Sequence, residues 1–329
     1  MVCKKKEAFR ISLIFLEATI LVFFFSLLIS NVFAVVGENN VTVQSQLDIG
    51  NVFPDVLNVS LQDGDATLSL TPNSTTSVNC VALVQDYNGD GDITSAYAEF
   101  FDFTNSFLGD SDDNNYHYTN SSCTFETDFG SWNGQSDDAY TALVNCTFDT
   151  WYYANAGEWT CSVVASDTYN WQDSGEDNIT VSQLLALGLP DVIYYGEVNA
   201  TYVSDENITN VTNFGNVAMN LSLSGYAISE GDGYAMNCSL GSVGYIPIGY
   251  EKYNLSDVTS GSLTLSEFES LYTNLTSSPV VEEFNLNYRQ NDVTNEATNW
   301  TYWRIYVPLG VAGTCQGNIV FGAVEAPAS

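Results

Sequence analysis

The segment from Asp86 to Asp92 carries oxygen-bearing side chains at a spacing that suits a metal ion. Four of them stand two residues apart: Asp86, Asn88, Asp90 and Asp92. Calcium takes several hard oxygen ligands from a curved backbone, and Gly89 and Gly91 allow such curvature. An EF-hand loop would need a glutamate where Tyr97 stands. Two interpretations stay open: a weak structural Ca²⁺ site, and a polar turn that favours these residues for turn geometry alone.

Other residues that could do chemistry form no recognisable catalytic set. A second acidic cluster, Asp110, Asp112 and Asp113, is typical of a solvated loop. His117 is the only histidine, so a Ser-His-Asp site would have to use it. We expect His117 in an exposed loop, and no Gly-X-Ser-X-Gly or His-Glu-X-X-His motif occurs. Carboxylate pairs for glycoside hydrolysis are numerous and none stands out. The sequence therefore predicts no enzyme, with a secreted hydrolase as a minor alternative.

Aromatic residues gather in short groups that allow two interpretations. These residues are Trp151, Tyr152, Tyr153, Trp159, Trp171, Trp300, Tyr302 and Trp303. Exposed aromatic rings could stack on sugars or anchor a protein partner. Packing in a core is the commoner role, and we expect it for most of this group.

Short alternating runs separated by Gly, Asn, Asp and Ser clusters predict many β-strands. One inward face is expected from Val78, Cys80, Ala82 and Val84, and another from Cys161, Val163 and Ala165. In the second half, Cys315, Ile319, Phe321 and Ala323 are expected on one face of a last strand. One short helix is expected at residues 265–272, where Ser266 and Glu269 resemble a capping box.

The N-terminus reads as an export signal. Lys4, Lys5, Lys6 and Arg10 precede an apolar run over residues 11–29, and Ala34 ends a cleavage-like Val-Phe-Ala site. The run is long for a signal peptide and close to the length that spans a bilayer. Cleavage after Ala34 and retention as a membrane anchor both stay open.

The charge of the exported part is extreme. Beyond residue 34 the chain has 38 acidic and three basic residues, a formal charge of −35. Such a surface repels nucleic acid and anionic lipid and attracts divalent cations. Nucleic acid is therefore excluded as a partner.

The cysteine count agrees with export. Cys3 lies in the leader and six cysteines follow, an even number that predicts disulfides: Cys80, Cys123, Cys146, Cys161, Cys238 and Cys315. Four fall in the first half of the chain and two in the second. Cys238 is expected to pair with Cys315, because that half offers no other partner.

Fourteen Asn-X-Ser/Thr sites predict a glycoprotein if the host glycosylates: Asn40, Asn58, Asn73, Asn120, Asn145, Asn178, Asn199, Asn207, Asn210, Asn220, Asn237, Asn254, Asn274 and Asn299. A chain rich in Asn, Ser and Thr also makes such sites by chance. Asn220 lies in a run whose odd positions are apolar, so we expect its side chain on the solvent face.

The segment from Ala156 to Cys161 resembles the F-strand signature of immunoglobulin-like domains. The resemblance implies a disulfide between Cys161 and Cys80 on the matching B strand. Trp159 stands in place of the family's corner tyrosine, so its hydroxyl hydrogen bond cannot form. No Trp follows Cys80 at C-strand distance, so Tyr97, Phe100 and Phe101 are expected to fill the core instead.

The separation of Cys80 and Cys161 implies an acidic insertion at residues 103–140. Cys123 and Cys146 flank its second half and are a candidate local disulfide pair.

The run from Val84 to Ile93 also resembles sandwich modules of archaeal S-layer-like surface glycoproteins. Residues 211–223, with Asn213, Gly215 and Asn216, and residues 307–321 are similar to strand pairs of envelope modules. The resemblance implies structural or adhesive modules without catalytic residues.

Together these features predict an all-β chain of two tandem immunoglobulin-like β-sandwiches after a leader or anchor helix. The expected parts are a signal peptide or anchor at 1–34, a sandwich with the insertion at 35–183 and a second sandwich at 184–329. The boundary falls at residues 184–190, which read as a short linker or an apolar edge.

The predicted function is a noncatalytic glycoprotein on the extracellular face of the envelope, anchored or secreted, acting as a structural, spacer or adhesive module. The alternative is a carbohydrate- or protein-binding adhesin that uses exposed aromatics or the insertion. Expected partners are envelope proteins or surface glycans, and the membrane if the leader is retained. No cofactor beyond structural Ca²⁺ is expected.

Overall fold

The computed structural model describes residues 42–257, 261–290 and 297–327. The chain divides into two units, residues 1–50 and 51–329. In the first unit, residues 42–50 are exposed and form neither helix nor strand. The predicted leader or anchor at residues 1–34 and the glycosylation site at Asn40 lie outside the described residues. No helix in the described ranges has the length and apolarity needed to cross a bilayer.

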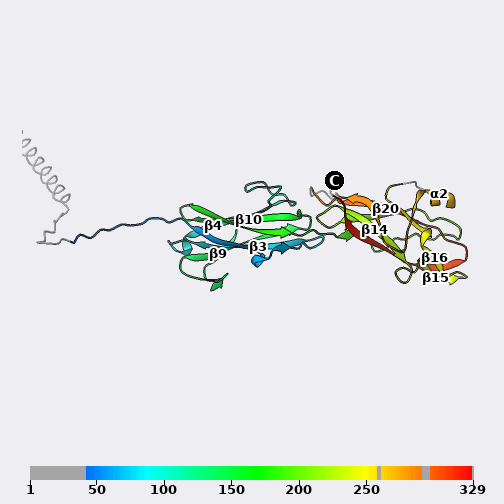
Figure 1. Cartoon of the computed structure of the whole chain (residues 1–329), viewed down its shortest axis with the longest axis horizontal. Helices are drawn as coiled ribbons and strands as arrows, with labels where there is room; N and C mark the ends of the chain where they lie inside the picture. The colour runs from blue at the N-terminus through cyan, green and yellow to red at the C-terminus, as the bar shows by residue number, and fades with distance from the viewer. Residues whose placement is uncertain (1–41, 258–260, 291–296, 328–329) are drawn as a thin grey trace, which may run out of the picture. The chain divides into compact units, whose positions relative to one another are not determined.

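The first half of the second unit is a two-layer β-sandwich, with β3 and β9 in one layer and β4 and β10 in the other (Figure 1). One sheet has the order β1 (Asp55–Leu61), β3 (Thr75–Gln85), β9 (Thr141–Trp151), β6 (Thr124–Glu126). The other has the order β2 (Thr67–Leu68), β11 (Gln172–Val181), β10 (Gly157–Asp167), β4 (Ile93–Asp102), β5 (His117–Asn120). All pairs are antiparallel except β2 with β11. The orders match the A-B-E-D and G-F-C sheets of an immunoglobulin-like fold, and β5 takes the C′ position.

The predicted alternation forms the core between these sheets. Val78, Cys80, Ala82 and Val84 on β3 are fully buried, as are Cys161, Val163 and Ala165 on β10. A disulfide joins Cys80 to Cys161 across the two sheets. The burial arises because one face of each strand is apolar and meets the other sheet.

Trp159 takes over the role of the corner tyrosine with different chemistry. Its side chain is fully buried against Phe100, with ring centroids 4.7 Å apart. Its indole N–H donates to the backbone carbonyl of Asn155 at 2.9 Å. The family's tyrosine hydroxyl bonds to backbone a few residues upstream, and here an indole makes that connection. Of the expected core substitutes, Phe100 fills the core, Tyr97 is half-buried, and Phe101 is buried on the opposite face of β4.

The predicted insertion at residues 103–140 contains β5, β6, β7 (Ser131–Trp132) and β8 (Gln135–Ser136). β5 pairs with the edge of β4. The side chains of Glu99 and Phe101 on the outer face of β4 are buried. A disulfide joins Cys123 to Cys146, so this insertion is tied to the sandwich.

Three further sheets form a second sandwich. The first has the order β12 (Leu187–Gly188), β13 (Asn207–Asn213), β20 (Thr298–Ile305), β17 (Glu251–Asn254), β18 (Thr273–Asn274). The second has the order β19 (Val280–Leu286), β14 (Met219–Tyr226), β22 (Asn318–Glu325). The third has the order β16 (Tyr245–Pro247), β15 (Tyr234–Gly241), β21 (Val311–Gln316). Trp303, Met219 and Leu221 are buried at its centre, and Cys238 is bonded to Cys315. The all-β tandem-sandwich prediction is confirmed. Residues 187–188 form β12, paired with β13.

The described helices are few and short. They are the 3-10 turns η1 (Gln62–Gly64), η2 (Asp90–Asp92) and η3 (Ile248–Tyr250), and the α-helix α2 (Leu265–Leu271). The predicted helix is present, but its capping box uses Thr264 and Glu267 rather than Ser266 and Glu269. The N-cap hydroxyl must precede the first helical turn, so the motif begins two residues earlier than predicted.

Two predictions about strands in the second sandwich are wrong. The expected last strand is two strands, with Cys315 on β21 and Ile319, Phe321 and Ala323 on β22. Asn220 is buried rather than on the solvent face. A register shift in β19 places the backbone N–H groups of Phe284 and Asn285 at Asn220 Oδ1, at 2.9 Å each. This irregularity converts a solvent-facing position into an internal acceptor.

Candidate functional site

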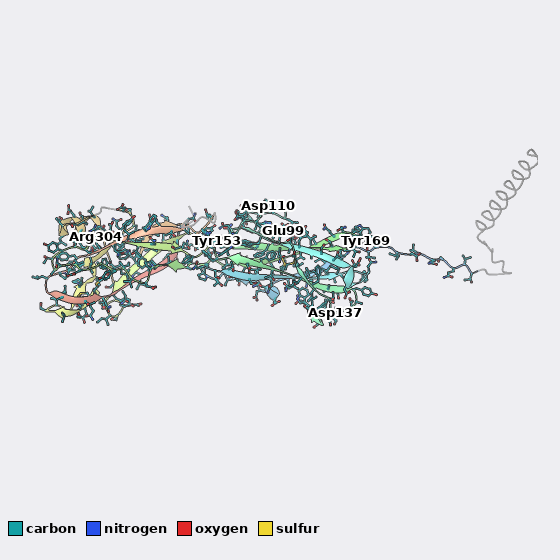
Figure 2. The ribbon with its side chains drawn as sticks, turned by 180° about the vertical axis from the view of Figure 1, so that it is seen from behind. Glu99, Asp110, Asp137, Tyr153, Tyr169 and Arg304 are labelled. Carbon is teal, nitrogen blue, oxygen red and sulfur yellow. A yellow bond between two sulfur atoms is a disulfide. The ribbon has the colours of Figure 1, made fainter. Side chains whose placement is uncertain are left out.

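One end of the first sandwich gathers loops from distant parts of the chain. We call it the loop end and define it as residues 51–53, 86–92, 137–140 and 167–171. Asp86 N–H donates to the Tyr140 carbonyl at 2.8 Å, and Val52 N–H donates to Asn88 Oδ1 at 2.7 Å. Figure 2 shows Tyr169 at this end and Tyr153 at the other end of the sandwich. The β3–β4 and β10–β11 turns correspond to the B–C and F–G loops of immunoglobulin-like domains.

Three carboxylates meet inside the loop end. One oxygen from each of Asp86, Asp92 and Asp167 lies within 4.8 Å of the other two. Asp86 and Asp167 are buried and Asp92 is half-buried. Burial raises the pKa of Asp86, hydrogen bonding from Asn88 N–H opposes this, and the charges of Asp92 and Asp167 raise it further. The arrangement is strongly electronegative.

Hydrogen bonds hold Asp167 in its charged form. Asn51 Nδ2 donates to Asp167 Oδ2 at 2.5 Å, and the N–H groups of Tyr169 and Trp171 donate to Oδ1 at 2.8 Å each. Burial opposes ionisation, but these bonds outweigh it and lower the pKa of Asp167. Thr168 Oγ1 donates to Asp92 Oδ1 at 2.5 Å.

The predicted metal ligands are only partly brought together. Asp86 and Asp92 belong to the three-carboxylate group, and Asp90 lies in η2 outside it. Asn88 is exposed and its Oδ1 accepts from Val52 N–H. Sequence reasoning missed Asp167, which follows β10 far along the chain. Its Asp-Thr-Tyr-Asn turn after a strand marks a loop, but gives no sign that this loop meets residues 86–92.

Exposed aromatic side chains surround the carboxylates. Phe53 stacks on Trp171 with centroids 4.1 Å apart, and Tyr169 lies 6.5 Å from Trp171. Tyr87 and Tyr140 form a second pair at 5.8 Å. All five are between 38% and 67% exposed. A cluster of this kind offers a hydrophobic contact surface with polar neighbours.

The aromatic residues singled out in the sequence differ in their burial. Tyr152, Tyr153, Trp159 and Trp303 are buried, as expected for core packing, and Trp151 and Tyr302 are half-buried. Trp171 and Trp300 are exposed. The core interpretation therefore fails for these two tryptophans.

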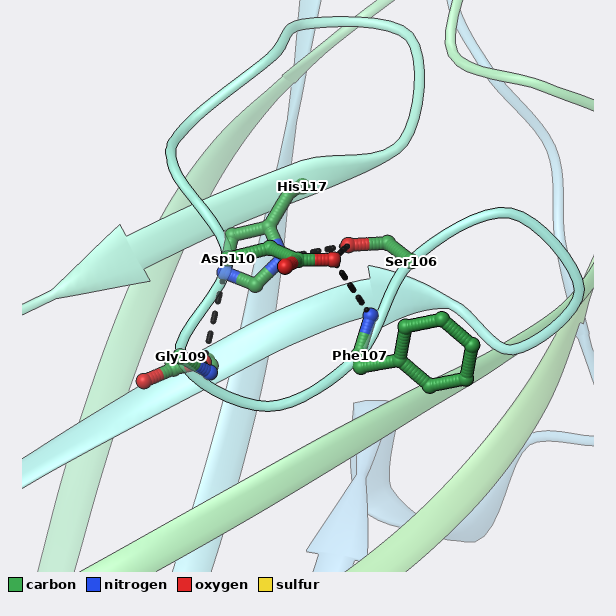
Figure 3. Close-up of polar contacts among 6 residues, drawn as sticks. Ser106, Phe107, Gly109, Asp110 and His117 are labelled. Atoms are coloured by element: carbon green, nitrogen blue, oxygen red, sulfur yellow. Dashed lines mark hydrogen bonds and ion pairs between the residues drawn. The ribbon is translucent and has the colours of Figure 1, made fainter.

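His117 is fully buried, contrary to the expectation of an exposed loop residue. Its Nδ1 lies 2.8 Å from Ser106 Oγ (Figure 3), and its Nε2 lies 3.3 Å from Glu99 Oε2. The Nε2 contact has the distance of an ion pair, and Nε2 makes no hydrogen bond within the described residues. Asp110 Oδ2 accepts from Ser106 Oγ at 3.1 Å and from Phe107 N–H at 2.9 Å. The prediction failed because the insertion covers the outer face of β4.

This network has the residue types of a hydrolase triad without its geometry. In a Ser-His-Asp triad, Nε2 faces the serine and Nδ1 faces the acid. Here Nδ1 faces Ser106 and Nε2 faces Glu99. Ser106 has no exposed surface, so a substrate cannot reach its Oγ in this conformation. The network ties the loop from Ser106 to Asp110 onto β4. Asp110 and Asp112 are exposed, and Asp113 is half-buried.

The glycosylation sites differ in accessibility. Within the described residues, the predicted asparagines other than Asn220 are exposed or half-buried. Asn220 is buried and hydrogen-bonded, so attaching a glycan there would require β14 and β19 to separate.

Comparisons with known proteins give only remote likeness. No protein family model matches the chain, and no curated protein matches it. The CsuC–CsuE chaperone–tip adhesion subunit complex of Acinetobacter baumannii is 8% identical, with a TM-score of 0.33 over 79% of this chain and 97% of that one. The C-terminal domain of the AgI/II polypeptide BspA of Streptococcus agalactiae is 10% identical, with a TM-score of 0.24 over 83% and 96%.

Carbohydrate-binding modules of the β-sandwich superfamily are 11% identical, with a TM-score of 0.20 over 84% of this chain and 100% of theirs. Scores this low carry no inference about function, so a functional assignment depends on the loop end itself.

Proposed function

We propose that the chain is a noncatalytic, exported surface glycoprotein whose first sandwich binds glycans through the loop end. The observation that carries this proposal is the exposed aromatic cluster of Phe53, Tyr169 and Trp171. Large exposed rings in contact with one another are costly to leave in water, and a bound partner removes that cost.

Glycans suit this surface because it combines ring faces with many polar groups. Sugar rings present C–H faces that pack on aromatic rings, and their hydroxyl groups need acceptors. Asn, Asp and Thr side chains lie beside the rings, as in the Asp167–Trp171 turn. The formal charge of −35 beyond residue 34 favours neutral or cationic ligands over anionic ones.

The noncatalytic part of the proposal is supported by the burial of Ser106 and His117. The surface location is supported by three disulfides, which are typical of exported proteins. Membership of an archaeal envelope stays a prediction from the sequence resemblance.

A glycan array probed with the purified full chain tests the proposal. Trp171→Ala should weaken binding at least about tenfold, because interface aromatics often account for more than 1.4 kcal/mol. Trp300→Ala is the matched control, because Trp300 is also exposed but lies on the second sandwich. Its binding should equal that of the wild type.

Two outcomes would overturn glycan binding at this site. One is a folded wild-type protein that binds no glycan on the array. The other is a Trp171→Ala variant that binds as the wild type does. Phe53→Ala gives a second reading of the same cluster if Trp171→Ala folds poorly.

A further inference from the structure

Four buried side-chain oxygen atoms of the loop end have no hydrogen-bond partner among the described residues. Three of them are Asn51 Oδ1, Asp86 Oδ2 and Asp92 Oδ2, and the fourth is Asp137 Oδ1, which is not one of the three clustered carboxylates. Asp86 has no exposed surface, and Asn51 is held beside Asp167 by its Nδ2 hydrogen bond. A buried acceptor without a partner is destabilising, and more so if it is charged. Several such atoms around one carboxylate group indicate a site suited to a donor or a cation.

Among the residues that the structure describes, no basic side chain pairs with this group. The ion pairs within the described ranges join His117 to Glu99 and Lys252 to Glu269, and neither pair involves the loop end. Beyond residue 34 the other basic residues are Arg289, over the Tyr153 ring, and Arg304, buried in the second sandwich. Three carboxylates this close repel one another unless a cation or protons intervene.

We propose that Asn51, Asp86, Asp92 and Asp167 bind one Ca²⁺ ion at the loop end. Carboxylate and amide oxygens are hard ligands, which Ca²⁺ takes at about 2.3–2.6 Å. Opposite ligands of one Ca²⁺ therefore lie about 4.6–5.2 Å apart, which accommodates the 4.8 Å limit on the three carboxylate oxygens. Calcium tolerates irregular ligand sets, and these ligands come from three separate segments.

The ion would add to the hydrogen bonds that already join these segments, from Asn51 to Asp167 and from Thr168 to Asp92. It would connect Asn51 to the β3–β4 turn and the β10–β11 turn. Phe53 lies in the same short segment as Asn51, and the backbone N–H of Trp171 donates to Asp167. Ca²⁺ bound to Asn51 and Asp167 would therefore also fix the aromatic cluster. The inference stands on different residues from the glycan proposal, and either can fail alone.

Terbium luminescence and calorimetry of the purified full chain test the site. Tb³⁺ substitutes for Ca²⁺, and excitation of Trp171 and the nearby tyrosines should sensitise its emission. Ca²⁺ should displace Tb³⁺ with a midpoint at least tenfold lower than that of Mg²⁺. Calorimetry should show one Ca²⁺ per chain. Both are done in about 1 M NaCl, where the Debye length of about 3 Å suppresses diffuse surface binding.

Asp92→Asn and Asp112→Asn form a matched pair, because each removes one acidic charge. Asp92→Asn should weaken Ca²⁺ binding at least tenfold and abolish the calcium-induced rise in Tm. In EDTA it should melt at or above the wild-type temperature, because it relieves repulsion. Asp112→Asn, on the exposed loop, should bind as the wild type does.

The calcium proposal is overturned if millimolar Ca²⁺ gives no heat of binding and millimolar Tb³⁺ gives no sensitised emission. It is also overturned if Asp92→Asn and Asp112→Asn lose Ca²⁺ affinity equally, because that would indicate binding to general surface charge. Displacement of Tb³⁺ by Mg²⁺ at the same concentration as by Ca²⁺ would overturn it too.

Discussion

Glu251 carries a buried carboxyl group in the second sandwich, and its Oε1 accepts a hydrogen bond from the Tyr195 hydroxyl at 2.8 Å. Burial raises the pKa of Glu251 to about 7, although the hydrogen bond opposes the shift. Burial and the adjacent carboxylate raise the pKa of Tyr195 well above its usual value. The pair therefore makes folding sensitive to pH in the neutral range.

The sign of that sensitivity follows from the raised pKa. A proton binds Glu251 more tightly in the folded state, so its stabilising effect is complete below about pH 4.5 and is lost as pH rises through about 7. Glu251→Gln should remove this dependence and gain up to about 3 kcal/mol relative to the wild type between pH 4.5 and pH 8. Urea unfolding at a series of pH values measures it. Glu197→Gln, at an exposed position, should leave the wild-type slope, and parallel curves for all three proteins would contradict the prediction.

Some residues of the loop end could be predicted from the sequence and others could not. Asp86 and Asp92 could be chosen because their spacing is local. Asp167 could not, because its contact with them depends on two turns meeting across a fold. His117 looked like a loop residue because nothing near it in sequence reports that a loop covers the outer face of β4.

At the scale of elements, the second half of β4 is buried on both faces. Ala96, Ala98 and Phe100 face the core, while Glu99 and Phe101 lie on the outer face, where the loop of residues 106–110 contacts Glu99. A strand that is buried on one face alternates apolar and polar residues, whereas this one carries a nearly continuous apolar run. The sequence predicted that Phe100 and Phe101 would both fill the core, and it gave no sign that Phe101 lies on a second, covered face.

The corner before β10 gives a test of one element. Trp159→Phe removes the indole N–H, leaves the Asn155 carbonyl without its 2.9 Å partner and opens a small cavity. We expect a loss of about 1–3 kcal/mol in the free energy of unfolding. Trp300→Phe, at an exposed position, should change it by less than about 0.5 kcal/mol. Denaturant unfolding compares the two, and equal effects would show that the corner bond contributes nothing.

The fold class and core faces could be predicted because alternation and the Ala156–Cys161 motif are local patterns. The position of Asn220 could not, because a register shift in β19, an element far along the chain, decides it. Irregularities between strands leave little trace in the strand that they affect.

At the scale of the whole molecule, charge is distributed unequally between surface and interior. Lys252 and Arg304 are buried, bound to Glu269 and to the Ser204 carbonyl respectively. Of the three basic residues beyond residue 34, only Arg289 is not buried, and it is half-buried. The charged groups on the described surface are therefore almost all acidic.

Such a surface should make stability depend on salt. Raising NaCl from about 0.05 to about 1 M shortens the Debye length to about 3 Å and screens self-repulsion. We expect Tm to rise by several degrees, measured by calorimetry in EDTA. Choline chloride at equal ionic strength is the control, because screening does not depend on the cation. A flat or falling Tm would contradict this prediction.

The burial of Lys252 and Arg304 also affects how readily trypsin cleaves the folded protein. Trypsin cleaves after lysine and arginine, and beyond residue 34 it finds only three such positions. Two of them lie within β17 and β20, where the backbone is paired and the side chain cannot enter a protease pocket. Cleavage at these two sites must await local unfolding, so the same scarcity of basic residues that makes the surface charge negative also makes the folded protein hard for trypsin to digest.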